Sequence, residues 1–189
     1  MTPIAREIWG PALGFLELES ISRGMVVADA LVKRAAVTIA LAEPTTPGKY
    51  VLLFFGGVGE VQESFAAGVE SAGSTLLDKL FLPQPAANLV RGLRGEFDAR
   101  AGESVGIVET HTVASALLAA DSALKRAEVW LRRLHLARGI GGKGYFTLTG
   151  PLHMVQAALE GAAAAIEAPL LLAAELIERP HPELEGPVF

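Results

Sequence analysis

Four carboxylates occur at matching positions of the chain and are the first candidates for chemistry. Glu17 and Glu109 lie 92 positions apart, and the same offset separates Asp29 from Asp121. Paired carboxylates can act together as general acid and general base. However, no histidine or serine is repeated beside them, and residues kept in both halves of a duplicated chain more often serve the shared scaffold. We therefore predict that no residue is catalytic and that the protein is not an enzyme.

The sequence contains no pattern that indicates a bound metal or a bound nucleotide. The chain has no cysteine, which excludes disulfides, zinc thiolates and thiolate-held iron–sulfur clusters. Its four histidines show neither H-x-H nor H-E-x-x-H spacing. The segment GIGGKG, Gly139–Gly144, fits G-x-G-x-x-G, but it precedes a predicted strand instead of opening a helix, so it does not indicate a dinucleotide. We expect no metal and no cofactor.

Composition narrows the class of protein further. Apolar residues make up 51% of the chain and charged residues 20%, with a net charge of −5. No basic run interleaved with aromatic residues is present, so we expect no nucleic-acid partner. The apolar segments are too short to span a membrane, and the first residues do not resemble a secretory signal, which predicts a cytosolic protein with no membrane contact. The apolar excess is expected to be covered by other subunits.

The chain contains an internal repeat, a feature to be sought before any other. Residues 13–37, LGFLELESISRGMVVADALVKRAAV, match residues 105–129, VGIVETHTVASALLAADSALKRAEV, at an offset of 92. Beyond these segments the offset becomes 94, where Gly48-Lys49 matches Gly142-Lys143. The sequence therefore predicts a tandem duplication of a unit of about 80 to 90 residues, with two extra residues in the second copy.

Hydrophobic periodicity predicts the same order of elements in each copy: strand, helix, strand, strand, helix, strand. In the first copy these elements are expected over residues 12–18, 24–35, 37–42, 49–55, 59–73 and 76–82, followed by a short closing helix at 85–93. Val26, Ala30 and Val37 are expected near one face of the first helix. This order is the ferredoxin-like α+β arrangement, with helices on one face of the sheet.

Charge and glycine content suggest where one copy ends and the next begins. The segment NLVRGLRGEFDARAGES, Asn88–Ser104, is rich in both. We predict a first domain over residues 11–95, a linker over 96–103 and a second domain over 104–189.

Both repeated segments resemble the opening of the bacterial microcompartment (BMC) shell domain. The ending ELIERPHPEL, Glu175–Leu184, resembles the characteristic ending of that domain, and the elements follow its ordinary, non-permuted order. The chain thus resembles tandem-domain shell proteins, and within them the branch that includes the iron–sulfur shell protein of propanediol-utilisation compartments. This resemblance implies a homotrimer, in which three chains form a pseudohexameric ring of six BMC domains.

The resemblance also implies a pore at the centre of the ring, surrounded by the loop between the second and third strands of each domain. The implied pore-lining residues are Thr45, Thr46, Pro47, Gly48, Ile140, Gly141 and Gly142. In the iron–sulfur relative a cysteine directly precedes the Pro-Gly-Lys sequence, whereas this chain has Thr46. Hydroxyls cannot replace the thiolates that such a cluster needs, so the electron-relay function is not carried over.

Three basic residues correspond to tile-edge contacts of the family. Lys33 and Lys125 match its edge lysine, and Arg179 matches the arginine of its closing motif, for which the first copy has no equivalent arginine. A simpler interpretation of the two lysines is an i,i+4 pair with Asp29 and Asp121, worth a few tenths of a kcal/mol. The sequence alone does not separate the two interpretations.

The function implied by the resemblance is structural. The chain would be a trimeric facet tile of a microcompartment shell in the cytoplasm, with a pore for small polar metabolites. Other shell proteins would be its lateral partners, and encapsulated enzymes are further candidate partners. The alternative is a soluble trimeric ligand-binding or regulatory protein that holds a metabolite in inter-subunit clefts.

Overall fold

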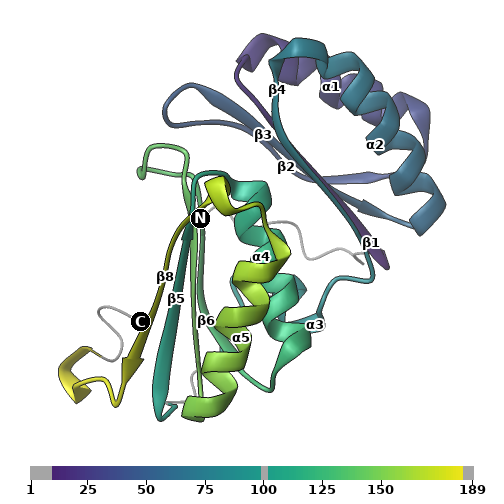
Figure 1. Cartoon of the computed structure of the whole chain (residues 1–189). Coiled ribbons are helices and arrows are strands. Elements are labelled where there is room, and N and C mark those ends of the chain that lie inside the picture. Colours follow the sequence, from purple (N-terminus) through teal and green to yellow (C-terminus); the bar gives the residue numbers. More distant parts are fainter. Residues whose placement is uncertain (1–9, 99–101, 185–189) are drawn as a thin grey trace. The chain divides into compact units, whose positions relative to one another are not determined.

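The computed structural model describes residues 10–98 and 102–184, which form two compact units (Figure 1). The first unit contains the described residues up to Pro85 together with Ala137–Gly142, and the second contains Ala86–Leu136 and the described residues from Lys143 onward. Residues 99–101 of the predicted linker, 185–189 of the predicted second domain and the N-terminal residues 1–9 lie outside the described ranges.

The first unit has the predicted strand and helix order. Its elements are β1 (Ala12–Leu18), α1 (Ile21–Arg34), β2 (Thr38–Thr45), β3 (Lys49–Gly56), α2 (Val58–Ala72), the 3₁₀ turn η1 (Gly73–Thr75) and β4 (Leu76–Pro83). The strands pair antiparallel in the order β2-β3-β1-β4, and both helices lie on one face of the sheet (Figure 1). The predicted α+β, ferredoxin-like fold is thereby confirmed.

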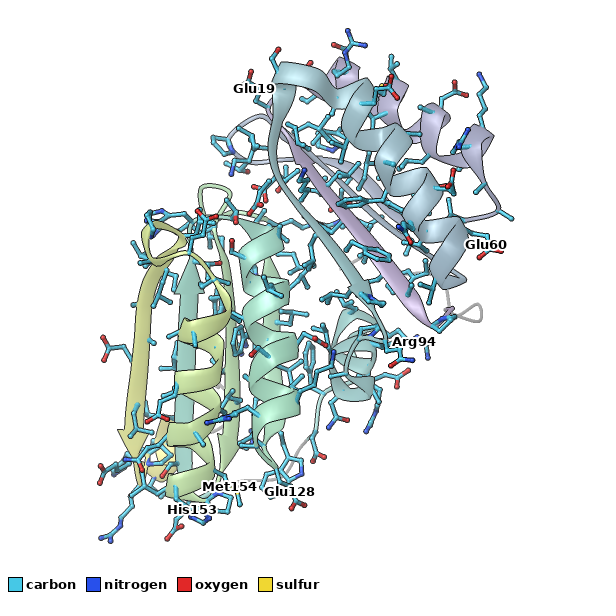
Figure 2. All side chains as sticks on the ribbon, turned by 45° about the vertical axis from the view of Figure 1, so that its right-hand side comes forward. Glu19, Glu60, Arg94, Glu128, His153 and Met154 are labelled. Carbon is cyan, nitrogen blue, oxygen red and sulfur yellow. The ribbon has the colours of Figure 1, made fainter. Side chains whose placement is uncertain are left out.

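The second unit repeats this arrangement after a short helix. Its elements are α3 (Ala87–Leu93), β5 (Ser104–Thr110), α4 (Val113–Arg126), β6 (Trp130–Leu136), β7 (Gly144–Gly150), α5 (Leu152–Ala165), η2 (Ala168–Leu170), β8 (Leu171–Glu178) and η3 (Pro182–Leu184). The strand order is β6-β7-β5-β8. Helices α4 and α5 run antiparallel, so that Glu128, just past α4, lies at the same end as His153 and Met154 of α5 (Figure 2).

Matching residues begin the first helix of each unit. The Ser20 side chain accepts a hydrogen bond from the Arg23 amide, and the Thr112 side chain accepts one from the Ser115 amide, both at 3.2 Å. Such N-caps satisfy amides that have no partner within the helix. Helix α2 ends at Gly73, whose φ of 54° suits glycine. None of the described helices is long and apolar enough to cross a membrane.

The face of α1 that carries Val26 was expected to pack on the sheet and does not, and Val37 lies beyond the end of the helix, where it packs against the core. The helix buries Gly24, Val27 and Leu31 against the sheet, whereas Val26 is 51% exposed. The error arises because α1 carries apolar residues on two faces, so periodicity alone does not show which face packs on the sheet. The inward face is selected by Gly24, whose lack of a side chain lets the helix approach Tyr50 on β3.

The two units solve this helix–strand contact in opposite ways. In the first unit, Gly24 lies beneath the large side chain of Tyr50. At the equivalent positions of the second unit, Ala116 on α4 lies beneath Gly144 on β7. The larger residue of the pair is thus on the strand in the first unit and on the helix in the second. In both units a glycine allows the helix and the strand to approach closely.

We predict that Gly24→Ala destabilises the first unit by about 1–2 kcal/mol, because the added Cβ would lie 2.7 Å from Cβ of the buried Tyr50. Gly59→Ala in α2 is the matched control, since a Cβ there meets nothing within 4 Å. Its stability should stay unchanged or rise by up to about 1 kcal/mol. Urea denaturation of both variants would refute this packing if they behaved alike.

Candidate functional site

The connection between β2 and β3 is a tight turn, Thr45–Gly48. The Gly48 amide donates a hydrogen bond to the Thr45 carbonyl at 2.8 Å, and Gly48 has a φ of 116° that favours glycine. Strand β2 ends at Thr45 and β3 begins at Lys49. Four of the predicted pore-lining residues therefore form one structural element.

A second segment, Ala137–Gly142, belongs to the same compact unit. Positive φ angles at Gly139, Gly141 and Gly142 explain its glycine content. A Cβ at Gly142 would lie 3.0 Å from Nζ of Lys49 and 3.1 Å from Cδ of Pro47. Glycine at this position therefore permits close approach to the base of the Thr45–Gly48 turn.

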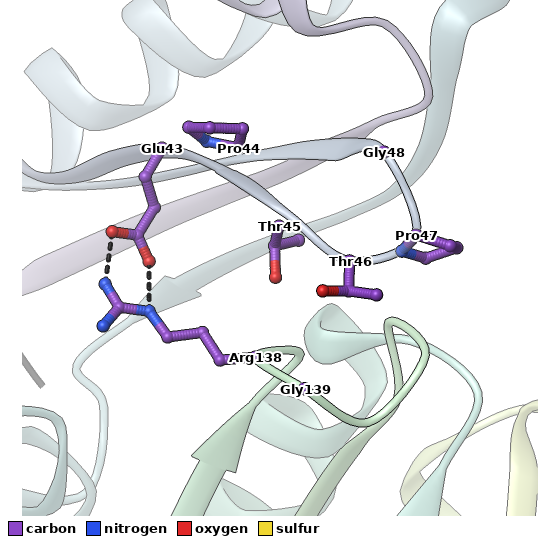
Figure 3. A pocket seen from close by; sticks show the side chains of 8 residues that line it. All are labelled: Glu43, Pro44, Thr45, Thr46, Pro47, Gly48, Arg138 and Gly139. Carbon is purple, nitrogen blue, oxygen red and sulfur yellow. Dashed lines mark hydrogen bonds and ion pairs between the residues drawn. The ribbon is translucent and has the colours of Figure 1, made fainter.

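The turn and this segment line an open pocket of about 740 Å³ (Figure 3). Its lining comprises Glu43, Pro44, Thr45, Thr46, Pro47, Gly48, Arg138 and Gly139. The Thr45 hydroxyl points toward the segment that carries Arg138 and Gly139, and the Thr46 side chain lies on the same side of the turn (Figure 3). Thr45 is only 8% exposed, and its Oγ1 has no hydrogen-bond partner among the described residues.

The structure thus brings some of the predicted pore residues together and leaves others out of the pocket. Thr45, Thr46, Pro47 and Gly48 share its wall, whereas Ile140, Gly141 and Gly142 are not part of the lining. Gly142 instead touches the turn from the side of Lys49.

Sequence reasoning missed the ion pair that closes one end of the pocket. The Arg138 guanidinium donates through Nε to Oε1 of Glu43 at 2.7 Å and through Nη2 to Oε2 (Figure 3). This paired geometry is typical of strong arginine–carboxylate contacts. No local signal could have indicated it, because neither residue has a residue of the same kind at the matching position of the other copy, and the two lie 95 positions apart.

A buried ion pair lies at the base of the turn. Nζ of Lys49 donates to Oε1 of Glu17 at 2.6 Å, and these side chains are 18% and 0% exposed. Lys49 also donates to the Gly142 carbonyl at 3.4 Å. Glu17 pairs in register with Val51, so Lys49 is its diagonal neighbour on the same face of the sheet. The carboxylate is thus neutralised where β1, β3 and the Ala137–Gly142 segment meet.

The same ion pair recurs in the second unit with different surroundings. Nζ of Lys143 lies 2.8 Å from Oε1 of Glu109, but these side chains are 41% and 35% exposed. The repeated glutamate and the repeated Gly-Lys sequence are therefore the two ends of one cross-strand contact. Both signals were visible in the sequence, and the missing information was the strand pairing that joins them.

Tyr50 follows Lys49 and is a neutral neighbour of the pocket. Burial, reinforced by the negative charge of Glu43, raises the pKa of the Tyr50 phenol above its ordinary value. The phenol therefore stays protonated near neutral pH and adds no charge beside Glu43.

The predicted tile-edge residues lie on other elements. Lys33 and Lys125 close the last turns of α1 and α4, and each donates to the aspartate one turn earlier at 2.6 Å. The simple i,i+4 interpretation is therefore confirmed, and the edge contact stays a prediction. Arg179 follows β8 with a φ of 54°. Its counterpart in the first unit is Gln84, which follows β4 with a φ of 65°.

Comparison with known families identifies the repeated unit. The BMC domain model matches residues 12–85 and again residues 104–180. The chain belongs to the BMC domain family. The BMC shell protein PduT from Citrobacter freundii, described as a bacterial microcompartment shell protein, is 41% identical over 171 residues, which cover 90% of this chain and 93% of that protein. This chain is thus a microcompartment shell protein with two BMC domains in tandem.

Other BMC proteins support the same assignment. A crystal structure of a microcompartment protein from Desulfitobacterium hafniense is 35% identical with a TM-score of 0.81, covering 92% of this chain and 97% of that one. The carboxysome shell protein CcmK2 from Thermosynechococcus vestitus is 37% identical over 82 residues, which are 41% of this chain and 80% of that protein. The similarity therefore extends to shorter shell proteins that match less than half of this chain.

We predict that Lys49→Met destabilises the protein by about 3 kcal/mol, because it removes the cation paired with the buried Glu17 carboxylate. The double variant Glu17→Gln/Lys49→Met should recover part of this loss, since a neutral amide is cheaper to bury. Arg34→Met, which breaks an exposed ion pair with Glu63, should cost no more than about 1 kcal/mol. Equal losses for Lys49→Met and Arg34→Met in urea denaturation would contradict the prediction.

Proposed function

We propose that the protein is a trimeric facet tile of a bacterial microcompartment shell, with a central pore for small polar metabolites. Three chains would supply six BMC domains, which form a ring of pseudo-sixfold symmetry. The role is structural, and no catalytic residue is part of the proposal. Such a tile would lie in the cytoplasm as part of the shell, beside other BMC proteins and outside the enclosed enzymes.

The observation that carries the ring is the unequal covering of the two Glu–Lys pairs. In the first unit, the Gly142 carbonyl lies against Lys49 and the Glu17 carboxylate is fully buried. In the second unit, Lys143 and Glu109 remain more than one third exposed. Gly48 is the repeat equivalent of Gly142. The Thr45–Gly48 turn of a second copy is thus the natural cover for Lys143.

This contact is head-to-tail, because one copy would offer the turn of its first unit to the second unit of its neighbour. Repeated contacts of this kind close into a ring when the rotation between copies permits. With two domains in each chain, closure of a six-domain ring needs three chains. The exposed ion pair would then be covered three times by the same interaction.

The ring would bring both kinds of connecting segment to the axis. Thr45, Thr46, Pro47 and Gly48 would alternate with Ile140, Gly141 and Gly142. The Thr45 hydroxyl, which has no partner among the residues that the structure describes, and the exposed Thr46 hydroxyl can both donate and accept hydrogen bonds. Glu43 and Arg138 neutralise each other. A pore with this lining suits small polar molecules better than highly charged ones.

The outer edges of the tile would use the exposed basic residues. Lys33 and Lys125 end two equivalent helices, and their side chains are 73% and 47% exposed. Arg179 has no arginine counterpart, because Gln84 occupies its position in the first unit. Edges of two kinds would therefore alternate around the trimer and contact neighbouring shell proteins.

The mass of the protein in solution tests the ring. At micromolar concentration we expect native mass spectrometry to give three copies of the 19.8 kDa chain. The physical reason is that association would remove the exposed apolar residues of α1 from water. A monomeric mass under these conditions would refute the proposal.

The edge lysines can be tested separately. We expect the overexpressed protein to form sheets or tubes in negative-stain electron microscopy, and Lys33→Ala/Lys125→Ala to abolish them while leaving the trimer mass unchanged. Lys79→Ala is the control for loss of an exposed lysine. Discrete trimers in the unchanged protein, without sheets at any tested salt concentration, would instead favour the regulatory alternative.

A further inference from the structure

The outward face of α1 is apolar and exposed. Ile21, Met25, Val26 and Val32 are 38%, 57%, 51% and 48% exposed, which is unusual for large apolar side chains gathered on one helix. Asp29 lies on the same helix with its side chain 58% exposed. This face therefore combines apolar surface with one carboxylate acceptor.

The equivalent face of α4 shows what such a surface contacts. Val113 and Leu117, the counterparts of Ile21 and Met25, are fully buried. Asp121, the counterpart of Asp29, has a side chain only 6% exposed. One oxygen of Asp121 pairs with Lys125, and the other accepts a hydrogen bond from the Ala86 amide at 2.6 Å. The Asp121 carboxylate thus accepts a hydrogen bond from the backbone amide of another segment.

Ala86 introduces the segment that packs on this face. Helix α3 follows it directly and lies against α4 and β6 within the second unit. Leu89 and Leu93 of α3 are 0% and 1% exposed, so they supply apolar contact area. The segment after β4 thereby caps the second unit, using one hydrogen bond and a short apolar helix.

The chain contains a second copy of this capping segment. Strands β4 and β8 pair with β1 and β5 in the same register, so Pro83 and Glu178 are equivalent. The next residues, Gln84 and Arg179, both have positive φ, and their amides donate to the carbonyls of Pro11 and Glu103. The backbone follows the same path at this point, which makes His181 the counterpart of Ala86.

In the part of the chain that the structure describes, this second segment is not covered by another element. His181, Pro182, Glu183 and Leu184 are all exposed, and Pro182–Leu184 form the 3₁₀ turn η3. Leu184 occupies the position of the buried Leu89. The exposed apolar face of α1 and the exposed segment His181–Leu184, which is equivalent to the segment that packs on α4, therefore occur in the same molecule.

We propose that the segment His181–Leu184 of one copy docks on the outward face of α1 of the next copy, where the His181 amide donates a hydrogen bond to Asp29. The occupant of this face is a second copy of the chain, because the chain carries both partners and they match the Ala86–Asp121 contact. This docking rests on the proposed ring. It would be a second contact between neighbouring copies, in addition to the contact at Lys143.

A disulfide tests the docking directly, because the chain has no cysteine of its own. In the full-length variant Asp29→Cys/His181→Cys, we expect oxidation to link neighbouring copies into a covalent trimer, visible on non-reducing gels at three times the single-chain mass. The geometry of the equivalent contact, with 2.6 Å between amide and carboxylate, brings the two backbones within reach of a disulfide.

Two controls make the result interpretable. Ala86→Cys/Asp121→Cys should form a disulfide within one chain, so it should run as a monomer on non-reducing gels. Asp29→Cys alone should give no covalent trimer. A second measurement is independent of disulfides: Met25→Glu should weaken the trimer by about tenfold or more, whereas Val58→Glu, at an exposed apolar residue of α2, should have little effect.

The outcomes separate the docking from the ring. If the unchanged protein has a trimeric mass, but Asp29→Cys/His181→Cys gives no intermolecular disulfide and Met25→Glu leaves the trimer intact, the docking is wrong and the ring stands. If the unchanged protein is a monomer, the ring and the docking both fall. Covalent trimers together with a Met25→Glu variant that dissociates more readily support the docking.

Discussion

The ion pair between the buried Glu17 carboxylate and Lys49 positions the Thr45–Gly48 turn and the pocket beside it. Glu17 lies on the central strand β1 with no exposed surface, and a charge in that position requires a cation beside it. Lys49 supplies the cation from the first residue of β3, which fixes where the Thr45–Gly48 turn begins. Its contact with Gly142 then holds the Ala137–Gly142 segment against that turn. The pocket, the two threonine hydroxyls and the Glu43–Arg138 pair are all arranged around this point.

Duplication gave the chain two copies of each contact, and their surroundings then diverged. The ion pair is closed in the first unit and open in the second, whereas the capping contact on the first helix is closed in the second unit and open in the first. The open contacts are complementary to groups that the chain itself presents. Unequal surroundings of equivalent residues are what a chain with two domains needs if several copies are to complete one ring. The same divergence reaches the core, where Gly24 and Tyr50 correspond to Ala116 and Gly144.

Much of the fold could be predicted from the sequence, because the repeat gives two independent sequence segments for each strand and helix. The strand and helix order, the helix capped by Ser20 and the turn before Lys49 all follow from local patterns. The inward face of α1 could not be predicted, since Val26 and Val27 are equally apolar and only the approach to Tyr50 distinguishes the faces. The pairing of Glu17 with Lys49 depended on strand register, and that of Glu43 with Arg138 depended on two distant segments meeting. Local sequence patterns carry no information on such contacts.

The most direct measurement of the central claim is a structure of the assembled protein at a resolution that shows side chains. The ring predicts threefold symmetry, with Nζ of each Lys143 within hydrogen-bonding distance of the Gly48 carbonyl of a neighbouring copy, as Lys49 is bonded to Gly142 within the chain. An assembly of another symmetry, or a threefold one in which Lys143 and Glu109 still face solvent, would contradict it.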